Sequence, residues 1–143
     1  MALNQLNKCF KGCVFILVFW TVLGCAKSKK NIEDNYDWNS RIVTATAYNS
    51  LAYQTSDTPN ITAFGDSLKP GFRYIAVSRD LLKLGLKHNT PVKIEGLEGV
   101  YWVKDKMHSR WKNRIDIYMG IDVKQARQWG RRRVCIDYGI PRP

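Results

Sequence analysis

The stretch RIDIYMG at residues 114–120 alternates apolar and polar side chains. Its apolar set is Ile115, Ile117 and Met119, and its polar set is Arg114, Asp116 and Tyr118. Alternation with a period of two is typical of a β-strand that buries one face. A second aspartate, Asp105, ends another apolar run 11 residues earlier. The sequence therefore predicts two strands that each present a carboxylate to one neighbourhood.

Around this strand, short apolar runs are separated by turn residues, a spacing typical of an all-β domain with short helical insertions. Strands are predicted at 41–48, 74–78, 90–96, 99–105, 114–120 and 131–138. A short helix is expected after Ser78, ending at Gly85, and another after Asp122, with Gln125 three residues later. About six short strands favour a small closed or nearly closed barrel, because closure protects strand edges.

The first 25 residues have the pattern of an export signal. Lys8 and Lys11 make the start basic, and an uncharged apolar run of 11 residues follows, from Cys13 to Leu23. A bilayer-spanning helix needs about 20 such residues, so this run predicts a cleaved signal peptide. It ends in VLGC, which resembles the lipobox of bacterial lipoproteins. We expect acylation of Cys25 and attachment to a membrane through lipid; a signal peptide with a chance cysteine is the alternative.

The remaining chain divides into a tether and one domain. Residues 26–40 are polar and charge-rich without a period, which predicts a flexible tether, and residues 41–140 suit a single small domain. Only Cys135 would remain in that domain, as a small buried apolar residue, so no internal disulfide is expected. With only His88 and His108 beside it, no metal site is expected, and no motif indicates a cofactor.

The charge of the chain limits its partners. Removing Lys8 and Lys11 with the signal lowers the formal net charge from +11 to +9. A basic exported protein suits an anionic polymer, and the carboxylates of peptidoglycan and anionic lipid headgroups are the candidates in a bacterial envelope. Nucleic acid is the usual partner of such charge, but the export signal argues against it. We expect a monomer in the cell envelope, at the outer membrane or its periplasmic side.

Several short motifs occur in an order that resembles a known family. They are TATAY, TAFGD, IAVSRDLLKLGL, an aspartate that ends a strand, RIDIYMG and GRRRVCI. Together they resemble the 3D (three-aspartate) domain, which is shared with the C-terminal part of membrane-bound lytic transglycosylase A. The resemblance covers residues 43–137. It implies a six-stranded double-psi β-barrel that cleaves the glycan strands of peptidoglycan.

The resemblance assigns roles to two aspartates. Asp116 matches the acid/base of these transglycosylases, and Asp105 matches the aspartate that opens a Gly-rich segment. That segment is DKMHSRWK here and holds no glycine. Ser78 stands in place of the third family aspartate, with Asp80 two residues further on. Two of the three family aspartates therefore align, and the loop between them differs in sequence from the Gly-rich segment of the family.

The chemistry of Asp116 depends on its surroundings. A lytic transglycosylase can work with one carboxyl group, whose pKa must rise above about 3.9 to donate a proton near neutral pH. Burial beside Ile115 and Ile117, or repulsion from Asp105, would raise this pKa, whereas Arg114 would lower it. The alternative is that Asp116 forms a structural ion pair on a barrel wall.

Other residues are candidates for contacts with sugar. Aromatic rings stack on the apolar faces of sugars, and Trp111, in a polar loop between the aspartates, is the preferred contact; Trp102 is predicted to belong to the core. The remaining substrate-binding candidates are Tyr48, Thr62, Asp66 and Tyr118. Thr62 and Asp66 are also typical turn formers. The sequence therefore leaves two functions open: a lipid-anchored enzyme that cleaves peptidoglycan, or a non-catalytic peptidoglycan-binding or structural lipoprotein.

Overall fold

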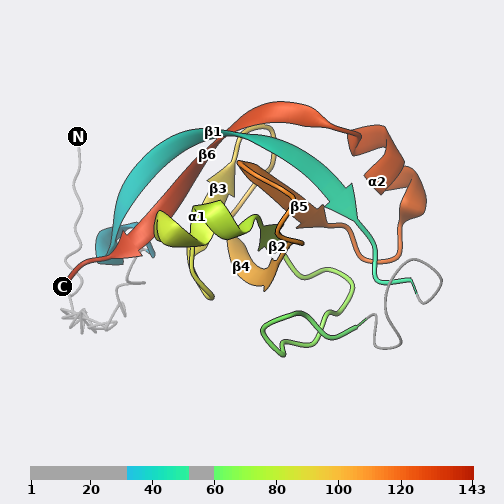
Figure 1. Ribbon diagram of the computed structural model, residues 1–143, viewed down its shortest axis with the longest axis horizontal. Helices are drawn as coiled ribbons and strands as arrows, with labels where there is room; N and C mark the ends of the chain where they lie inside the picture. The colour runs from blue at the N-terminus through green and yellow to red at the C-terminus, as the bar shows by residue number, and fades with distance from the viewer. Residues whose placement is uncertain (1–31, 52–59) are drawn as a thin grey trace, which may run out of the picture.

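The computed structural model describes residues 32–51 and 60–143, and these form a six-stranded barrel (Figure 1). The strands are β1 (Tyr36–Tyr48), β2 (Tyr74–Val77), β3 (Pro91–Ile94), β4 (Tyr101–Lys106), β5 (Arg114–Tyr118) and β6 (Arg132–Pro141). A 3-10 turn, η1 (Ile32–Asn35), precedes β1, and the helices are α1 (Arg79–Lys83) and α2 (Val123–Trp129). The expected all-β fold with two short helices is confirmed.

The strands close into a barrel in the order β1-β5-β2-β4-β3-β6. Two pairs are parallel, β1 with β5 and β2 with β4, and the other pairs are antiparallel. Consecutive strands are thus seldom neighbours, and the parallel pairs give the crossed connectivity of a double-psi barrel. Closure pairs both edges of every strand, as predicted from the shortness of the strands.

Alternate strand residues fill the barrel. Val43, Ile75, Val103, Ile115 and Ile136 are almost completely inaccessible and belong to one apolar cluster. Because successive side chains of a strand point to opposite faces, the residues between these positions lie on the outer face of the barrel. On β5 this places Ile115 and Ile117 inside and Asp116 outside.

The first strand begins earlier than the sequence indicates. Residues 36–40 were expected in the tether, but they form the start of β1 and pair with the last residues of β6. This part of the hairpin buries few side chains, so it lacks the apolar alternation that marks the rest of β1. The signal peptide, Cys25 and the tether before residue 32 lie outside the described residues. No helix of the described chain is long and apolar enough to span a bilayer.

The helix ends follow the predicted signals in one case and only partly in the other. The Asp122 side chain accepts a hydrogen bond from the Gln125 N–H and caps α2, which ends at Gly130. Ser78 lies at the N-cap of α1, but its side chain forms no capping bond. Cys135 is half-buried on β6 and does not belong to the apolar cluster, so its predicted place in the core is wrong.

Candidate active site

Four residues from four adjacent strands form a row on the outer face of the barrel. Thr46 of β1 stands opposite Asp116 of β5, Asp116 opposite Ala76 of β2, and Ala76 opposite Asp105 of β4. We call these residues the acidic row. Directly opposed residues present their side chains to the same face of a sheet, so the row brings the two aspartates to one face.

The spacing within the acidic row follows from the sheet. Neighbouring strands lie about 4.8 Å apart, so the backbones of Asp105 and Asp116 are separated by roughly 10 Å across β2. Ala76 contributes only a methyl group between them. A β-bulge in the β2–β4 pairing, between Ile75 and Ala76, sets the register that brings Asp105 opposite Ala76. No local sequence pattern predicts this bulge, because it is defined by the pairing of two distant strands.

Asp116 has the most perturbed carboxyl group of the row. Burial raises its pKa to about 6, and the charge of Asp105 adds to this, while the Thr46 hydroxyl and Arg114 act in the opposite direction. Its Oδ1 is buried and has no hydrogen-bond partner within residues 32–51 and 60–143. Asp116 also forms no ion pair in that part of the chain. These properties distinguish Asp116 as a buried, unpaired carboxyl with a raised pKa.

The source of this burial differs from the expectation. Ile115 and Ile117 point into the barrel and were expected to bury the carboxyl. The Asp116 side chain lies on the opposite face, near Tyr48. Burial raises the pKa of Tyr48 far above its ordinary range, and the charges of Asp105 and Asp116 raise it further.

Two tyrosines adjoin the acidic row. Tyr48 stands opposite Tyr118, and their ring centroids are 5.4 Å apart at an angle of 48°. The Tyr118 hydroxyl is hydrogen-bonded to Ser50 Oγ at 2.8 Å. The Tyr48 hydroxyl oxygen is buried and, among the described residues, has no partner. Tyr48 and Asp116 thus each bring one buried, unpartnered oxygen to this part of the barrel.

Asp105 holds the loop that follows residue 60. Its Oδ1 accepts hydrogen bonds from the Ala63 and Lys106 N–H groups, each at 2.8 Å. The carboxylate therefore links β4 to the loop, and its charge still reaches Asp116. This arrangement suits a positioning residue better than a second proton carrier.

Thr62 and Asp66 lie in this same loop, in structural roles. Thr62 is buried, and its Oγ1 accepts hydrogen bonds from the Phe64 and Asp66 N–H groups, which forms a turn. Asp66 accepts from Lys104 Nζ at 2.9 Å and contacts His88 Nε2 at 2.5 Å. Burial opposes ionisation of Asp66, but the bonds from Lys104 and His88 prevail and lower its pKa. Neither side chain points a free group toward the acidic row.

Trp111 lies beside arginines. The Arg114 guanidinium is 4.0 Å from the centroid of its ring, and that of Arg110 is 4.8 Å away. Arg114 occupies a position over the ring where a sugar would stack. Trp111 therefore holds Arg114 beside the site, and the structure gives no support for the predicted stacking on glycan.

Ser78 and Asp80 hold the backbone at the start of β5. Ser78 is fully buried, and its Oγ accepts a hydrogen bond from the Arg114 N–H at 3.0 Å. Asp80 accepts one from the Asn113 N–H at 2.8 Å. Both side chains fix the start of β5, two residues before Asp116, and neither faces the acidic row.

An aromatic and cationic cavity lies beyond Asp105. Its volume is about 540 Å³, and its lining includes Arg73, Tyr74, Trp102 and Lys104. Tyr74 stands opposite Trp102, one step along the strands from the acidic row. Trp102 is half-buried on the outer face, so its predicted place in the core is wrong. Its partly exposed ring makes Trp102 a candidate sugar contact in place of the core residue that was expected.

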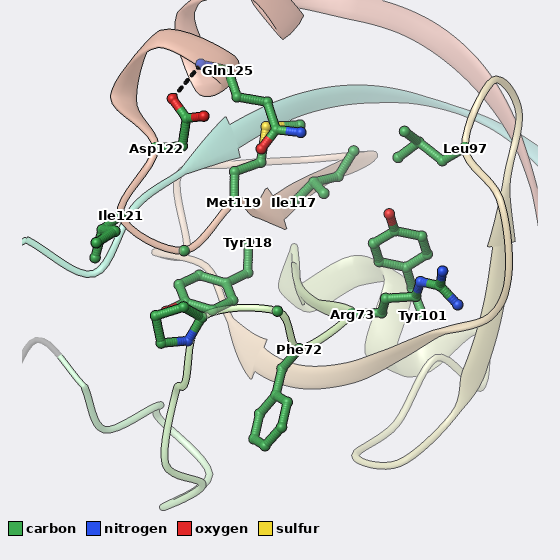
Figure 2. A pocket seen from close by; sticks show the side chains of 13 residues that line it. Phe72, Arg73, Leu97, Tyr101, Ile117, Tyr118, Met119, Ile121, Asp122 and Gln125 are labelled. Carbon is green, nitrogen blue, oxygen red and sulfur yellow. Dashed lines mark hydrogen bonds between the residues drawn. The ribbon is translucent and has the colours of Figure 1, made fainter.

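A second cavity of about 380 Å³ adjoins Tyr118 (Figure 2). Figure 2 shows Arg73 beside Tyr101 on one side, with Asp122 and Gln125 on the other. Arg73 and Phe72 line both cavities. The two hollows therefore meet at the segment that leads into β2.

The fold and the site define an all-β barrel with a carboxylate row between aromatic surfaces. No protein-family model matches the chain, and no curated protein matches it. Among solved structures, it is similar to an apo expansin of Clavibacter michiganensis, with 18% identity and a TM-score of 0.45. A mutant of that expansin in complex with cellohexaose gives 17% identity and a TM-score of 0.43. Each match covers 73% of this chain and 52% of the expansin, so this chain spans about half the length of that protein.

Proposed function

We propose that this barrel is a cell-envelope protein that binds peptidoglycan glycan strands and cleaves them in the manner of a lytic transglycosylase. The observation that carries this proposal is Asp116: a half-buried carboxyl with a pKa of about 6, an unpaired Oδ1 and no ion-pair partner in the described chain. Strongly perturbed carboxyl groups are typical of acid/base sites. The 3D-domain resemblance assigns the same residue to this role.

The reaction needs one proton carrier. Protonated Asp116 donates its proton to the glycosidic oxygen as the bond to the anomeric carbon breaks. The 6-hydroxyl of the same muramic acid then attacks that carbon and forms the 1,6-anhydro ring, and its proton returns to Asp116. No water enters the reaction, so no second base is required. A pKa of about 6 leaves part of the Asp116 population protonated near neutral pH.

The neighbours of Asp116 have supporting roles in this reaction. Asp105 raises the pKa of Asp116 through its charge and orders the adjacent loop through two backbone hydrogen bonds. Tyr48 and Tyr118 are largely buried and pack against each other beside Asp116. Trp102, which is half-buried, offers its ring to an adjacent sugar. In this proposal, a glycan strand binds along the outer face of β1, β5, β2 and β4.

One observation favours the alternative, a glycan-binding protein without catalysis. The cavity lined by Tyr74, Trp102 and Lys104 lies beside the acidic row and could hold sugars whether or not Asp116 transfers a proton. The rebuilt loop at 106–113 also departs from the Gly-rich segment of the family. Attachment to a membrane through lipid on Cys25 belongs to both versions of the proposal.

Cleavage of purified peptidoglycan distinguishes the two functions. The wild-type protein is expected to clear peptidoglycan in a zymogram and to release muropeptides with 1,6-anhydro ends. Asp116→Asn keeps the shape but cannot cycle a proton, so release should fall by about 10²–10⁴-fold. Asp137→Asn, on β6 and outside the acidic row, is the matched control and should cleave like wild type. Binding without cleavage by the wild-type protein would favour the non-catalytic function, and new reducing ends would indicate hydrolysis.

A further inference from the structure

Arg73 is an unpaired cation at the junction of the two cavities. Its guanidinium forms no ion pair and no hydrogen bond with any residue in 32–51 or 60–143. By contrast, Lys104 in the neighbouring cavity is neutralised by Asp66 at 2.9 Å. Arg73 is therefore the cation of these cavities that remains available to a bound anion.

The Gly99 backbone lies directly beside the Arg73 side chain. The guanidinium lies so close to Gly99 that a Cβ built on this glycine would come within 2.2 Å of Nη1. A side chain at position 99 would displace the guanidinium from this place, and the φ of +82° is one that glycine favours. On the other side, Arg73 lies near enough to Tyr101 that its charge opposes the effect of burial, which raises the tyrosine pKa. Arg73 is solvent-exposed, and its guanidinium lies between the Gly99 backbone and the Tyr101 ring.

We infer that Arg73 binds a carboxylate carried by a substituent of the glycan, in the cavity of Figure 2. This inference rests on the proposed function, because the sugar backbone would lie along the acidic row. A planar guanidinium binds a carboxylate through two parallel hydrogen bonds. The peptide stems of peptidoglycan carry such carboxylates, whereas a chain of N-acetylglucosamine has none.

The rest of the cavity suits a peptide rather than a second sugar chain. Leu97, Met119 and Ile121 give it apolar walls, and Gln125 adds an amide. Asp122 lies on the side away from Arg73 (Figure 2) and accepts the Gln125 N–H. Its negative charge disfavours a second carboxylate there. The cavity therefore selects a carboxylate at the Arg73 end and an uncharged or cationic group at the Asp122 end.

Three probes test the inference by calorimetry: a disaccharide-peptide with free carboxylates, the same compound with its carboxylates amidated, and an N-acetylglucosamine hexamer. The wild-type protein should bind the free carboxylate form about ten- to a hundredfold more tightly than the amidated form, as expected for a charge-assisted pair. Arg73→Gln should remove this preference. Because Arg73 also lines the cavity at Trp102, the hexamer measures any separate change in sugar binding, which should affect the free and amidated forms equally. Arg73→Lys should retain part of it, because the charge remains but the planar fork is lost.

Arg79→Gln is the matched control, because Arg79 is exposed at the start of α1 and lines neither cavity. It removes the same charge and should keep the full preference. A preference that survives in Arg73→Gln, or that disappears in Arg79→Gln as well, would overturn the inference. If the wild-type protein binds no sugar, the proposed function fails, and a free stem peptide then tests Arg73 separately: loss of its binding in Arg73→Gln supports the carboxylate site, and unchanged binding rejects it.

Discussion

Asp105 and Asp116 lie on the two strands that flank β2, and both stand opposite Ala76. The charge of Asp105 therefore acts on Asp116 across a single methyl side chain. Because Asp105 is also bonded to two backbone N–H groups, the two carboxyl groups have different tasks. One remains tied to the loop, and the other has a free oxygen and a raised pKa.

The raised pKa of Asp116 predicts a dependence of stability on pH. The folded-state pKa is about 6, and the value in an unfolded chain is about 3.9. The folded state is more stable with a neutral than with an ionised Asp116. The free energy of unfolding is therefore highest below about pH 4 and falls as the pH rises through about 6. Asp116→Asn, which stays neutral, should match wild type at pH 4 and exceed it by up to about 3 kcal/mol at pH 8. Thermal unfolding at both pH values measures this difference.

Asp137→Asn is the control for this measurement, because Asp137 lies on β6 and accepts a hydrogen bond from Ser40. It should show no gain in stability at pH 8. A lower melting temperature for Asp116→Asn at pH 8 would instead identify a structural ion pair, since an unpaired buried partner is costly.

Asp105→Asn should shift the pH profile of cleavage. Without the charge of Asp105, the pKa of Asp116 falls, so the loss of activity with rising pH should begin at lower pH than in wild type. Asp105→Ala should in addition lower the free energy of unfolding by about 2 kcal/mol, because Ala63 and Lys106 lose a charged acceptor. Rates between pH 4 and 8 and denaturant titrations measure the two effects. An unchanged profile in Asp105→Asn would remove Asp105 from the site.

Trp102→Ala should weaken binding of uncharged N-acetylglucosamine oligomers by about tenfold, in line with the loss of one stacked ring. Because the ring is half-buried on the outer face, the melting temperature should fall moderately while the fold is kept. Trp38→Ala, which removes a ring that contacts Lys93 near the start of β1, should leave the affinity unchanged. Equal losses in both variants would count against a sugar site at Trp102.

Cys25→Ser should abolish incorporation of labelled fatty acid and leave the precursor unprocessed or released from membranes. Metabolic labelling and membrane extraction measure these outcomes in cells that express the full chain. A Cys13→Ser variant provides the control, since that cysteine lies within the apolar run. Labelling that persists in Cys25→Ser would end the lipoprotein proposal.

Local patterns predicted much of the fold. The alternation at 114–118 predicted β5 and the side of the strand on which Asp116 lies, and the cap at Asp122 predicted the start of α2. Both signals depend on neighbours in the sequence. The start of β1 was missed because residues 36–40 pair with β6 without burying an apolar face.

The candidate site depends on contacts between distant residues, and there the sequence was a weaker guide. Lys104 occupies the bulge between Val103 and Asp105. Strict alternation from the inward Val103 would place Asp105 inside the barrel, so the bulge hid the outward position of Asp105. Trp111 looked free in a polar loop, but Arg114 covers it. No local pattern indicates that Gly99 makes room for Arg73.

The length of β1 has a mechanical consequence. Its 13 residues span roughly 40 Å at about 3.3 Å per residue, and Thr46 of the acidic row lies near its C-terminal end. It pairs with β6 from Tyr36 to Ala45 and with β5 from Thr44 to Tyr48. A glycan held at the row and a lipid at the other end would therefore pull β1 along its own axis. Such a load shears all these hydrogen bonds together and cannot open them one by one, so the strand would resist tension between wall and membrane.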